Sequence, residues 1–315
     1  MSYDAVTLGA HVLDILGRPV THIPPGQGSI ILDEIRLAPA GSSAGCAVGL
    51  AKLGVSVATV GAVGRDALGD VLLRALNSYG VDTRHVVRKA DAQTSASILP
   101  IRPNGDRPAL HAIGANPLFT IDEVPWPLIE SAKHLHLGGN DVMRGLGRDG
   151  AAQILRRARE HGATTTMDIL SEGSPKLLAI LAPCLPIVDW FMPNAEQACR
   201  LTEAGSAEDA ARRLLERGAR GVVLTMGGDG SMLMTRDAKL HLAAHAIDVV
   251  DTSGCGDAYC AGFIRGLLLG WIPAECMRLA NAAAALVATG LGSDAGIRDL
   301  DDTIRFMSET PLRSR

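Results

Sequence analysis

The stretch that most constrains the fold is residues 249–263, VVDTSGCGDAYCAGF. A β-branched run ends at Asp251, a serine and glycine turn follows, and a long apolar segment opens at Asp257. Gly254 and Gly256 let the backbone bend so that successive N–H groups face one point. A helix that starts here adds its unpaired first-turn N–H groups and the positive end of its dipole. The stretch therefore predicts a receptor for an anion such as a phosphate group.

Asp257 is expected at the mouth of this receptor, where its carboxylate could take a proton from an attacking hydroxyl. An aspartate after a glycine turn is also typical of ordinary helix capping, and spacing alone does not separate the two interpretations. Because the helix dipole favours negative charge at this end, we expect the pKa of Asp257 to be lowered.

The motif DTSGCGDAYxAGF closely resembles the signature DTxGxGDAFxAGF of the ribokinase-like (PfkB) sugar and nucleoside kinases. The resemblance implies a catalytic base at Asp257 and an anion hole at Gly254, Cys255 and Gly256. It further implies an α/β fold with a three-layer, doubly wound, mostly parallel sheet and a small β-sheet lid. ATP and Mg²⁺ are the implied cofactors. The expected reaction is transfer of the γ-phosphoryl group to a hydroxyl of a small sugar or sugar-like substrate.

A second segment, residues 40–54, resembles the first signature of the same family, GGxxxNxAxxxAxLG. It departs at Ala40, which replaces a glycine, and at Gly45, which replaces the asparagine that usually binds sugar. The resemblance places substrate contacts at Asp14, Gly41, Ser42, Gly45 and Asn140. Because the amide at position 45 is missing, the sequence does not identify the sugar.

Several shorter matches concern the nucleotide and the cations. Residues 225–230 resemble the nucleotide loop TxGxxG, and the resemblance implies nucleotide contacts at Asn194, Thr225, Gly227, Gly230 and Asn281. The family's NxxE motif, whose Glu helps to hold magnesium, has Gln197 here with Glu196 beside it. Either Glu196 substitutes, or the nucleotide itself holds most of the Mg²⁺. A loop for a monovalent cation, K⁺ in particular, is expected at Asp251, Ser253 and Gly292.

The chain reads as one ribokinase-like domain over residues 1–315. From residue 55 onward, expected strands and helices alternate, which favours a parallel sheet covered on both faces. Two stretches break this rhythm, at about 15–40 and 94–119, and the second contains the hairpin signal Asn104-Gly105-Asp106. We expect these insertions to form the lid, which in the family often doubles as a homodimer interface.

Charge and cysteine usage exclude several partners. The formal net charge is −4, so no basic field points to nucleic acid or to an anionic membrane surface. The six cysteines are scattered without a CxxC pair, which suits a reducing compartment. The N-terminal residues lack the pattern of a signal peptide, and no apolar run is long enough to span a bilayer. We therefore expect a cytoplasmic protein.

Other functions stay open on the sequence. A nucleoside kinase of the adenosine type would share every motif, and a purine-binding apolar pocket under the lid would distinguish it. A non-catalytic sugar sensor would bind sugar without turning over ATP. Residues 41–45 read GSSAG, the pattern of a serine hydrolase elbow with Ser43 as nucleophile, although Pro39 argues against the supporting strand. His134 and His136 alternate on one expected strand, and without a third ligand in view we expect partly buried polar residues rather than a metal pair.

Overall fold

The fold described here is that of a computed structural model, and it covers residues 3–314. Within that range the chain forms a nine-stranded sheet in the order β13-β12-β11-β10-β9-β8-β1-β4-β5 and a four-stranded sheet in the order β3-β2-β6-β7. The large sheet is parallel except at β11-β12 and β12-β13, which pair antiparallel. The strands are β1 (Ala5–Gly9), β2 (Val12–Arg18), β3 (Glu34–Ala40), β4 (Val57–Gly64), β5 (Asp82–Lys89), β6 (Ala96–Pro100), β7 (Leu110–Ala112), β8 (His134–Gly138), β9 (Thr164–Met167), β10 (Trp190–Phe191), β11 (Val222–Thr225), β12 (Ser231–Met234) and β13 (Lys239–Leu242).

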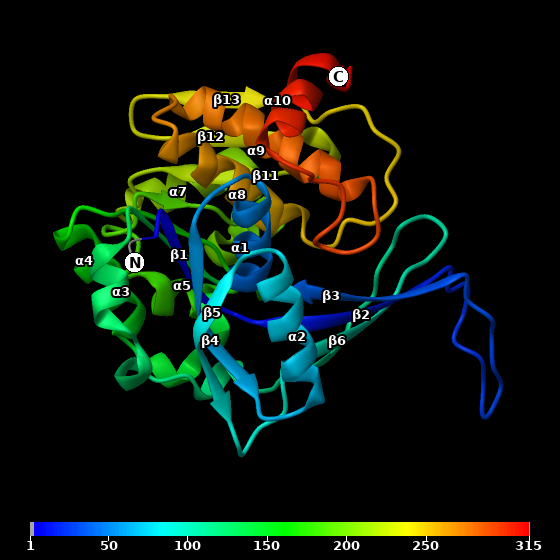
Figure 1. Cartoon of the computed structure of the whole chain (residues 1–315). Helices are drawn as coiled ribbons and strands as arrows, with labels where there is room; N and C mark the ends of the chain where they lie inside the picture. The colour runs from blue at the N-terminus through cyan, green and yellow to red at the C-terminus, as the bar shows by residue number, and fades with distance from the viewer. Residues whose placement is uncertain (1–2, 315) are drawn as a thin grey trace.

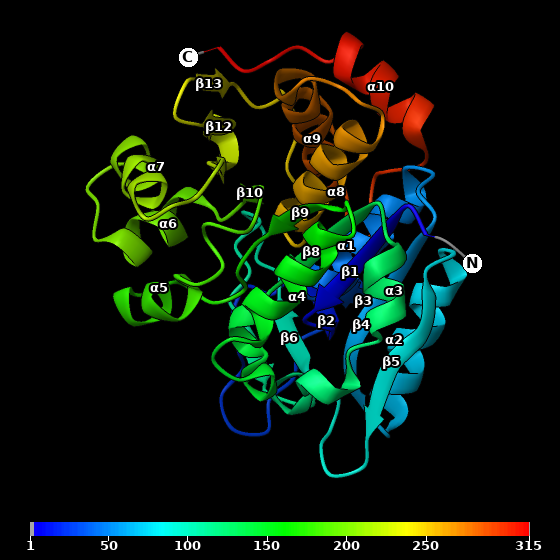
Figure 2. The ribbon, with the colours of Figure 1, turned by 90° about the vertical axis from the view of Figure 1, so that its left-hand side faces the viewer.

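Helices cover both faces of the large sheet, and each layer has its own apolar core. One core joins the sheet to α3, α4, α5, α6 and α7, and the other joins it to α1, α2, α8 and α9. Figure 2 shows α8 and α9 together on one side, with α5, α6 and α7 on the other. The helices are α1 (Ser42–Lys52), α2 (Ala67–Ser78), α3 (Trp126–Ser131), α4 (Gly150–Glu160), α5 (Pro175–Leu181), α6 (Ala195–Thr202), α7 (Ala207–Glu216), α8 (Cys255–Leu268), α9 (Pro273–Ala288) and α10 (Leu300–Glu309). The expected three-layer α/β architecture is confirmed.

Helix α8 is the buried central helix, and two of its glycines permit its packing. A Cβ at Gly262 would lie 2.7 Å from Ala280 Cα, and one at Gly266 would lie 2.9 Å from Cys276 Cα. These are approaches to the backbone of α9 that no side chain tolerates. The close approach holds the N-terminus of α8 at the carboxyl ends of the parallel strands, where sheets of this kind bind ligands.

The small sheet extends from one side of the body, and its strands β2, β3 and β6 project together in Figure 1. Pro39 lies inside β3, so the expectation that it prevents a strand there was wrong. β3 is an edge strand of the small sheet, a position that tolerates a residue without an N–H donor. No helix within residues 3–314 is both long and apolar enough to cross a membrane.

Candidate active site

A cleft of about 1260 Å³ lies between the small sheet and the carboxyl ends of the large sheet. Its walls bring together segments that are far apart in the sequence. Asp14 and Arg107 come from the small-sheet side, Thr225 from the end of β11, and Gly254 to Asp257 from the start of α8. The strongest sequence motif therefore opens onto this cleft.

The turn before α8 is held in one conformation by Gly254 and by two hydrogen bonds from Ser253 to Asp251. Gly254 has φ 72°, which favours glycine, and a Cβ there would collide with Ser293. Asp251 Oδ1 accepts hydrogen bonds from Ser253 N–H at 2.9 Å and from Ser253 Oγ at 2.8 Å. Around Gly256, by contrast, a Cβ would meet nothing within 4 Å, so this position faces open space.

Two of the three N–H groups expected in the anion hole are free within residues 3–314. Those of Gly254 and Gly256 donate to no described protein group, whereas Cys255 N–H makes a long 3.4 Å bond to Thr252 O. α8 is 14 residues long, so its dipole adds to these donors. The arrangement can receive an anion that enters from the cleft.

Asp257 lines the cleft, but the expectation that its pKa is lowered was wrong. Burial and the negative charge of Asp14 raise its pKa to about 7, although the positive charge of Arg107 acts to lower it. The side chain keeps a partly exposed edge toward the cleft while protein surrounds the rest. Removal from water and a second carboxylate both disfavour the charged form, which is the opposite of the effect expected from the helix dipole. The result is a carboxyl group that exchanges a proton near neutral pH.

Gly45 does not line the cleft, although it was expected to contact substrate. It lies in α1 directly behind Asp257, and a Cβ there would collide with the Asp257 carboxylate. The residue at 45 therefore makes room for the carboxyl group of Asp257. An asparagine at this position would require Asp257 to move.

Three of the other expected substrate contacts, Asp14, Gly41 and Ser42, do line the cleft. The side chain of Asp14 is buried, and burial raises its pKa to about 6 while Ser97 and Arg107 act in the opposite direction. Asn140 is not among the residues that line the cleft; it is buried one turn away, with no partner for its Oδ1 in the described chain. Its neighbour Asp141 faces the cleft instead and accepts the N–H groups of Leu170 and Ser171.

The expected nucleotide contacts also divide into residues that line the cleft and residues that do not. Asn194, Thr225 and Gly227 line the cleft, whereas Gly230 and Asn281 do not. Asn281 accepts a hydrogen bond from Ser231 Oγ at 2.9 Å and donates to Ala243 O at 3.1 Å, so its amide ties α9 to the antiparallel hairpin. The spacing of these motifs did not indicate which members face the cleft.

Gln197 has a structural task that a glutamate could not perform. Its Oε1 accepts the N–H of Asn194, and its Nε2 donates to Ile169 O at 3.1 Å and to Ser171 O at 2.8 Å. A carboxylate has no N–H to donate, so the two carbonyls need the amide. Glu196 lines the cleft but forms an ion pair with Arg200 at 2.7 Å.

Asp251, Ser253 and Gly292 come together as expected for the cation loop. Gly292 N–H donates to Asp251 Oδ2 at 2.9 Å, and Ser253 occupies Oδ1. These hydrogen bonds alone account for the grouping. The K⁺ role stays a prediction.

Sequence reasoning missed several charged residues of the cleft, Arg107 and Asp168 among them. Arg107 follows the hairpin signal at 104–106, and its Nε donates to Thr252 Oγ1 at 3.2 Å, which connects the lid to the turn before α8. Asp168 follows β9, at the carboxyl edge where ligand-binding residues gather, and this position was the available signal.

Ser43 does not face the cleft, contrary to the hydrolase alternative. Its side chain is fully buried, and its Oγ contacts the hydroxyl oxygens of Thr7 at 3.0 Å and Thr59 at 3.2 Å. No substrate carbonyl could reach it, so a hydrolase elbow is contradicted by the geometry.

Comparison with known proteins agrees with this geometry. The pattern that defines the pfkB family carbohydrate kinases matches residues 4–300. The ATP-dependent 6-phosphofructokinase of Thermoanaerobacterium thermosaccharolyticum is 24% identical over 310 residues, 97% of this chain and 94% of that protein. The aminoimidazole riboside kinase of Salmonella typhimurium is 24% identical over 284 residues, covering 87% and 89%. The crystal structure of ribokinase from Thermotoga maritima has a TM-score of 0.81 at 22% identity, with 98% of this chain and 100% of that chain covered.

The fold and the cleft define a phosphotransferase that acts on an alcohol group. The chain belongs to the pfkB family of carbohydrate kinases.

Proposed function

We propose that the protein is an ATP-dependent kinase that transfers the γ-phosphoryl group to a hydroxyl of a small sugar or sugar-like substrate. The observation that carries the proposal is the pairing of Asp257, with its pKa raised to about 7, and the free N–H groups of Gly254 and Gly256 beside it. The carboxylate of Asp257 can accept a proton while the two N–H groups stabilise negative charge on the phosphoryl group.

In this mechanism Asp257 takes the proton of the substrate hydroxyl as that oxygen bonds to the γ-phosphorus and ADP leaves. The pKa near 7 suits a general base at neutral pH. The N–H groups of Gly254 and Gly256, with the dipole of α8, stabilise charge on the transferring phosphoryl group. Alignment of the two substrates in the cleft can supply about 7–11 kcal/mol of the barrier reduction.

The donor set suits an Mg²⁺ ion that the nucleotide phosphates hold for the most part. Gln197 uses its amide within the protein, and of the two only Glu196 carries a carboxylate, whose Oε1 pairs with Arg200. Bound Mg²⁺ would neutralise charge on the phosphates. For nucleotide binding itself, Asn194, Thr225 and Gly227 form the wall opposite the lid.

A sugar is favoured over a nucleoside by the polarity of the lid side of the cleft. Asp14, Ser97 and Arg107 line it, and these groups suit hydroxyls. The apolar residues there, Leu99 and Ile113 among them, are interspersed with polar ones and do not form the continuous apolar wall that a purine would favour.

The replacement Asp257→Asn tests this proposal. We expect turnover to fall by about 10²–10⁴-fold, because the amide cannot accept the proton, while ATP still binds. Steady-state kinetics and ATP binding by calorimetry are the measurements. The matched control is Asp91→Asn, an equivalent change in an exposed carboxylate outside the cleft, which should leave turnover close to that of the parent. Near-normal turnover in Asp257→Asn would show that Asp257 is not the catalytic base. Absence of sugar-dependent ATP turnover in the parent protein would favour a non-catalytic sugar sensor.

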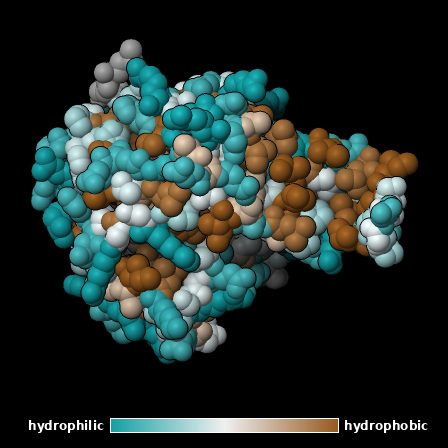
Figure 3. Space-filling view, turned by 90° about the horizontal axis from the view of Figure 1, so that it is seen from below, coloured by the Kyte–Doolittle hydropathy of each residue, from teal (hydrophilic) through white to brown (hydrophobic). Residues whose placement is uncertain are grey.

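We also propose that the lid supports a homodimer. Paired residues on neighbouring strands share a face of a sheet, and the pairs Ile15–Leu37, Ile15–Ile98 and Ile98–Leu110 therefore form one apolar row across the small sheet. Leu37, Ile98 and Leu110 are 48%, 53% and 61% exposed. Brown, apolar atoms gather on the projecting end of the molecule in Figure 3. A second copy of this face would cover the row.

A further inference from the structure

Three side chains with different donor atoms meet beneath the floor of the cleft. They are His136 on β8, Asp168 after β9 and Cys260 in the second turn of α8, and one ligand atom from each lies within 4.8 Å of the others. All three side chains are buried, with 0%, 6% and 2% of their surface exposed. The proposed catalytic chemistry uses none of them.

The imidazole of His136 has a hydrogen-bond partner at one ring nitrogen but, in the described part of the chain, none at the other. Its Nδ1 lies 2.9 Å from Thr166 Oγ1, which fixes the ring. Its Nε2 is buried and has no hydrogen-bond partner within residues 3–314. Asp168 Oδ2 is 3.8 Å away, which is too far for a hydrogen bond, and the backbone of Ser42 also lies close to the ring. A buried polar atom without a partner is costly, so a missing group at this point would relieve that cost.

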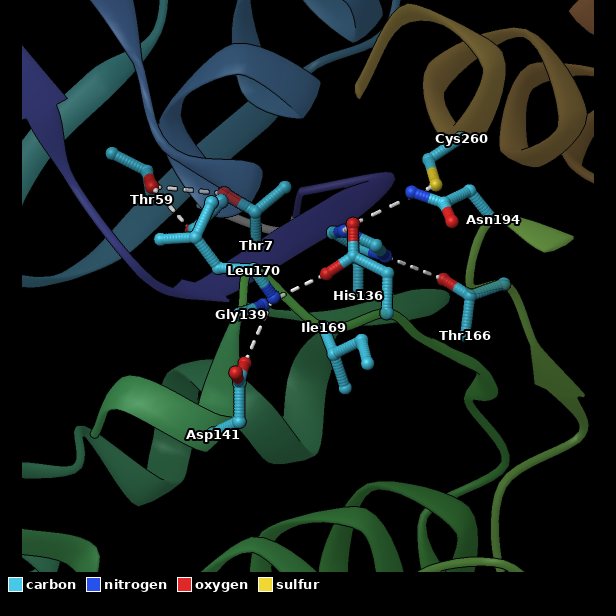
Figure 4. A network of polar contacts seen from close by, with 12 residues as sticks. Thr7, Thr59, His136, Gly139, Asp141, Thr166, Ile169, Leu170, Asn194 and Cys260 are labelled. Carbon is cyan, nitrogen blue, oxygen red and sulfur yellow. Dashed lines mark hydrogen bonds and ion pairs between the residues drawn. The ribbon is translucent and has the colours of Figure 1, made fainter. Parts of the chain in front are cut away.

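Asp168 presents one oxygen to the same point. Its Oδ1 accepts the N–H of Gly139 at 2.7 Å, which holds the carboxylate in place. Its Oδ2 accepts the S–H of Cys260 at a sulfur-to-oxygen distance of 3.9 Å, and Ser42 also donates a side-chain hydrogen bond to this carboxylate. Figure 4 shows Cys260 and His136 approaching this network from different elements, with the Gly139 contact marked.

We infer that His136, Asp168 and Cys260 form a binding site for a zinc-like divalent cation. Nitrogen, oxygen and sulfur donors together are typical of Zn²⁺, whereas Mg²⁺ selects oxygen alone. Bond lengths of about 2.0 Å to nitrogen and oxygen and about 2.3 Å to sulfur place tetrahedral ligand atoms roughly 3.3–3.6 Å apart. The two separations that involve Asp168, 3.8 and 3.9 Å, exceed this by a few tenths of an ångström, and all three ligand atoms lie within 4.8 Å, so the side chains must draw together when an ion binds.

The site has an entry path and an open coordination position. Asp168 lines the cleft, so an ion can reach the cluster from there. Three protein ligands leave the fourth position of a tetrahedral ion for water. Binding requires the thiolate form of Cys260, and its proton therefore leaves to solvent when the cation binds.

The site is tested by titrating the metal-free, full-length protein with Zn²⁺ and with Co²⁺ in the absence of nucleotide. We expect one tightly bound ion per chain, release of protons on binding, and a sulfur-to-cobalt charge-transfer absorption in the Co²⁺ form. Cys260→Ala should abolish that absorption and weaken Zn²⁺ binding by more than about tenfold. Cys184→Ala is the matched control, because Cys184 is a buried cysteine remote from the cluster, and it should keep both properties.

Two results of the Co²⁺ titration would overturn the inference. One is the absence of a charge-transfer band in the parent protein, which would mean that water satisfies His136. The other is a band that persists in Cys260→Ala, which would place the ion at another cysteine. If Cys260→Ala does not fold, Asp168→Asn serves instead. It keeps an acceptor for Gly139 N–H while removing the charge, and unchanged Zn²⁺ affinity in that variant would contradict the site.

Discussion

Asp14 and Asp257 face each other across the substrate side of the cleft, and their ionisation is linked. Burial raises both pKa values, to about 6 for Asp14 and to about 7 for Asp257, and the charge of Asp14 contributes to the second shift. Because a general base acts in its ionised form, turnover should rise with pH through about 7.

Asp14→Asn should move this acidic limb to lower pH. Asp14 is mostly ionised at pH 7, so its neutralisation removes a charge that disfavours ionised Asp257, and the pKa of Asp257 falls. The dependence of kcat/KM on pH in the two proteins is the measurement. The variant also loses a substrate contact, so the position of the limb, rather than its height, decides the outcome. An unmoved limb would mean that burial alone sets the pKa of Asp257.

The identity of Asp257 could be predicted from its motif, but its environment could not. The helix dipole is visible in the sequence, whereas burial and the approach of Asp14, a residue 243 positions earlier, arise only from the tertiary fold. Gly45 illustrates the same limit. It departs from the family signature, and only the position of the Asp257 carboxylate behind it shows what a side chain there would disturb.

At the scale of elements, α8 contains glycines with opposite surroundings. A Cβ at Gly262 would lie 2.9 Å from Leu279 O and 2.7 Å from Ala280 Cα, whereas a Cβ at Gly256 would meet nothing within 4 Å. Gly262→Ala should therefore lower the free energy of unfolding by about 1–3 kcal/mol through overpacking. The better helix propensity of alanine offsets about 1 kcal/mol of this.

Gly256→Ala is the comparison for this prediction. Its folded state has room for the methyl group, so its thermal stability should stay at or above that of the parent, while turnover falls because the methyl group occupies space beside the anion hole. Denaturant unfolding and kinetics of both variants are the measurements. Equal destabilisation at the two positions would show that helix propensity, and not the contact with α9, governs the effect.

The strands that the sequence analysis missed have two physical causes. Helix α2, by contrast, has local signals in its apolar spacing and in its Asp66 cap, whose side chain accepts the N–H of Gly69. β5 and β13 were not predicted, and both are edge strands of the large sheet with charged or exposed side chains. Edge strands carry such residues because one side of the strand lacks a partner, which weakens the hydrophobic alternation that prediction uses. β2 was missed because Asp14 and Gly17 interrupt an otherwise apolar run.

At the scale of the whole molecule, side-chain hydrogen bonds connect the lid to the body at several points. The Arg107 bond to Thr252 connects the tip of the lid to the turn that precedes α8. On the other edge of the lid, Arg36 pairs with Asp294 at 2.9 Å, close to the Gly292 loop. Thr252 belongs to the turn before α8, and Gly292 donates to Asp251 of the same turn, so both contacts connect the lid to the segments that support the anion hole.

The proposed dimer gives the lid a second constraint, and Ile98→Lys tests it. Ile98 is at the centre of the apolar row, paired with Ile15 on one side and Leu110 on the other. A charge there should remain hydrated in the monomer but be costly in a dry interface, so the variant should become monomeric. Light scattering coupled to size-exclusion chromatography measures this. Ile272→Lys is the matched control, since Ile272 is 65% exposed on the body, away from the lid, and should not change the mass. A parent protein that is monomeric at high concentration, or an Ile98→Lys variant that stays dimeric, would show that the apolar row does not form a dimer interface.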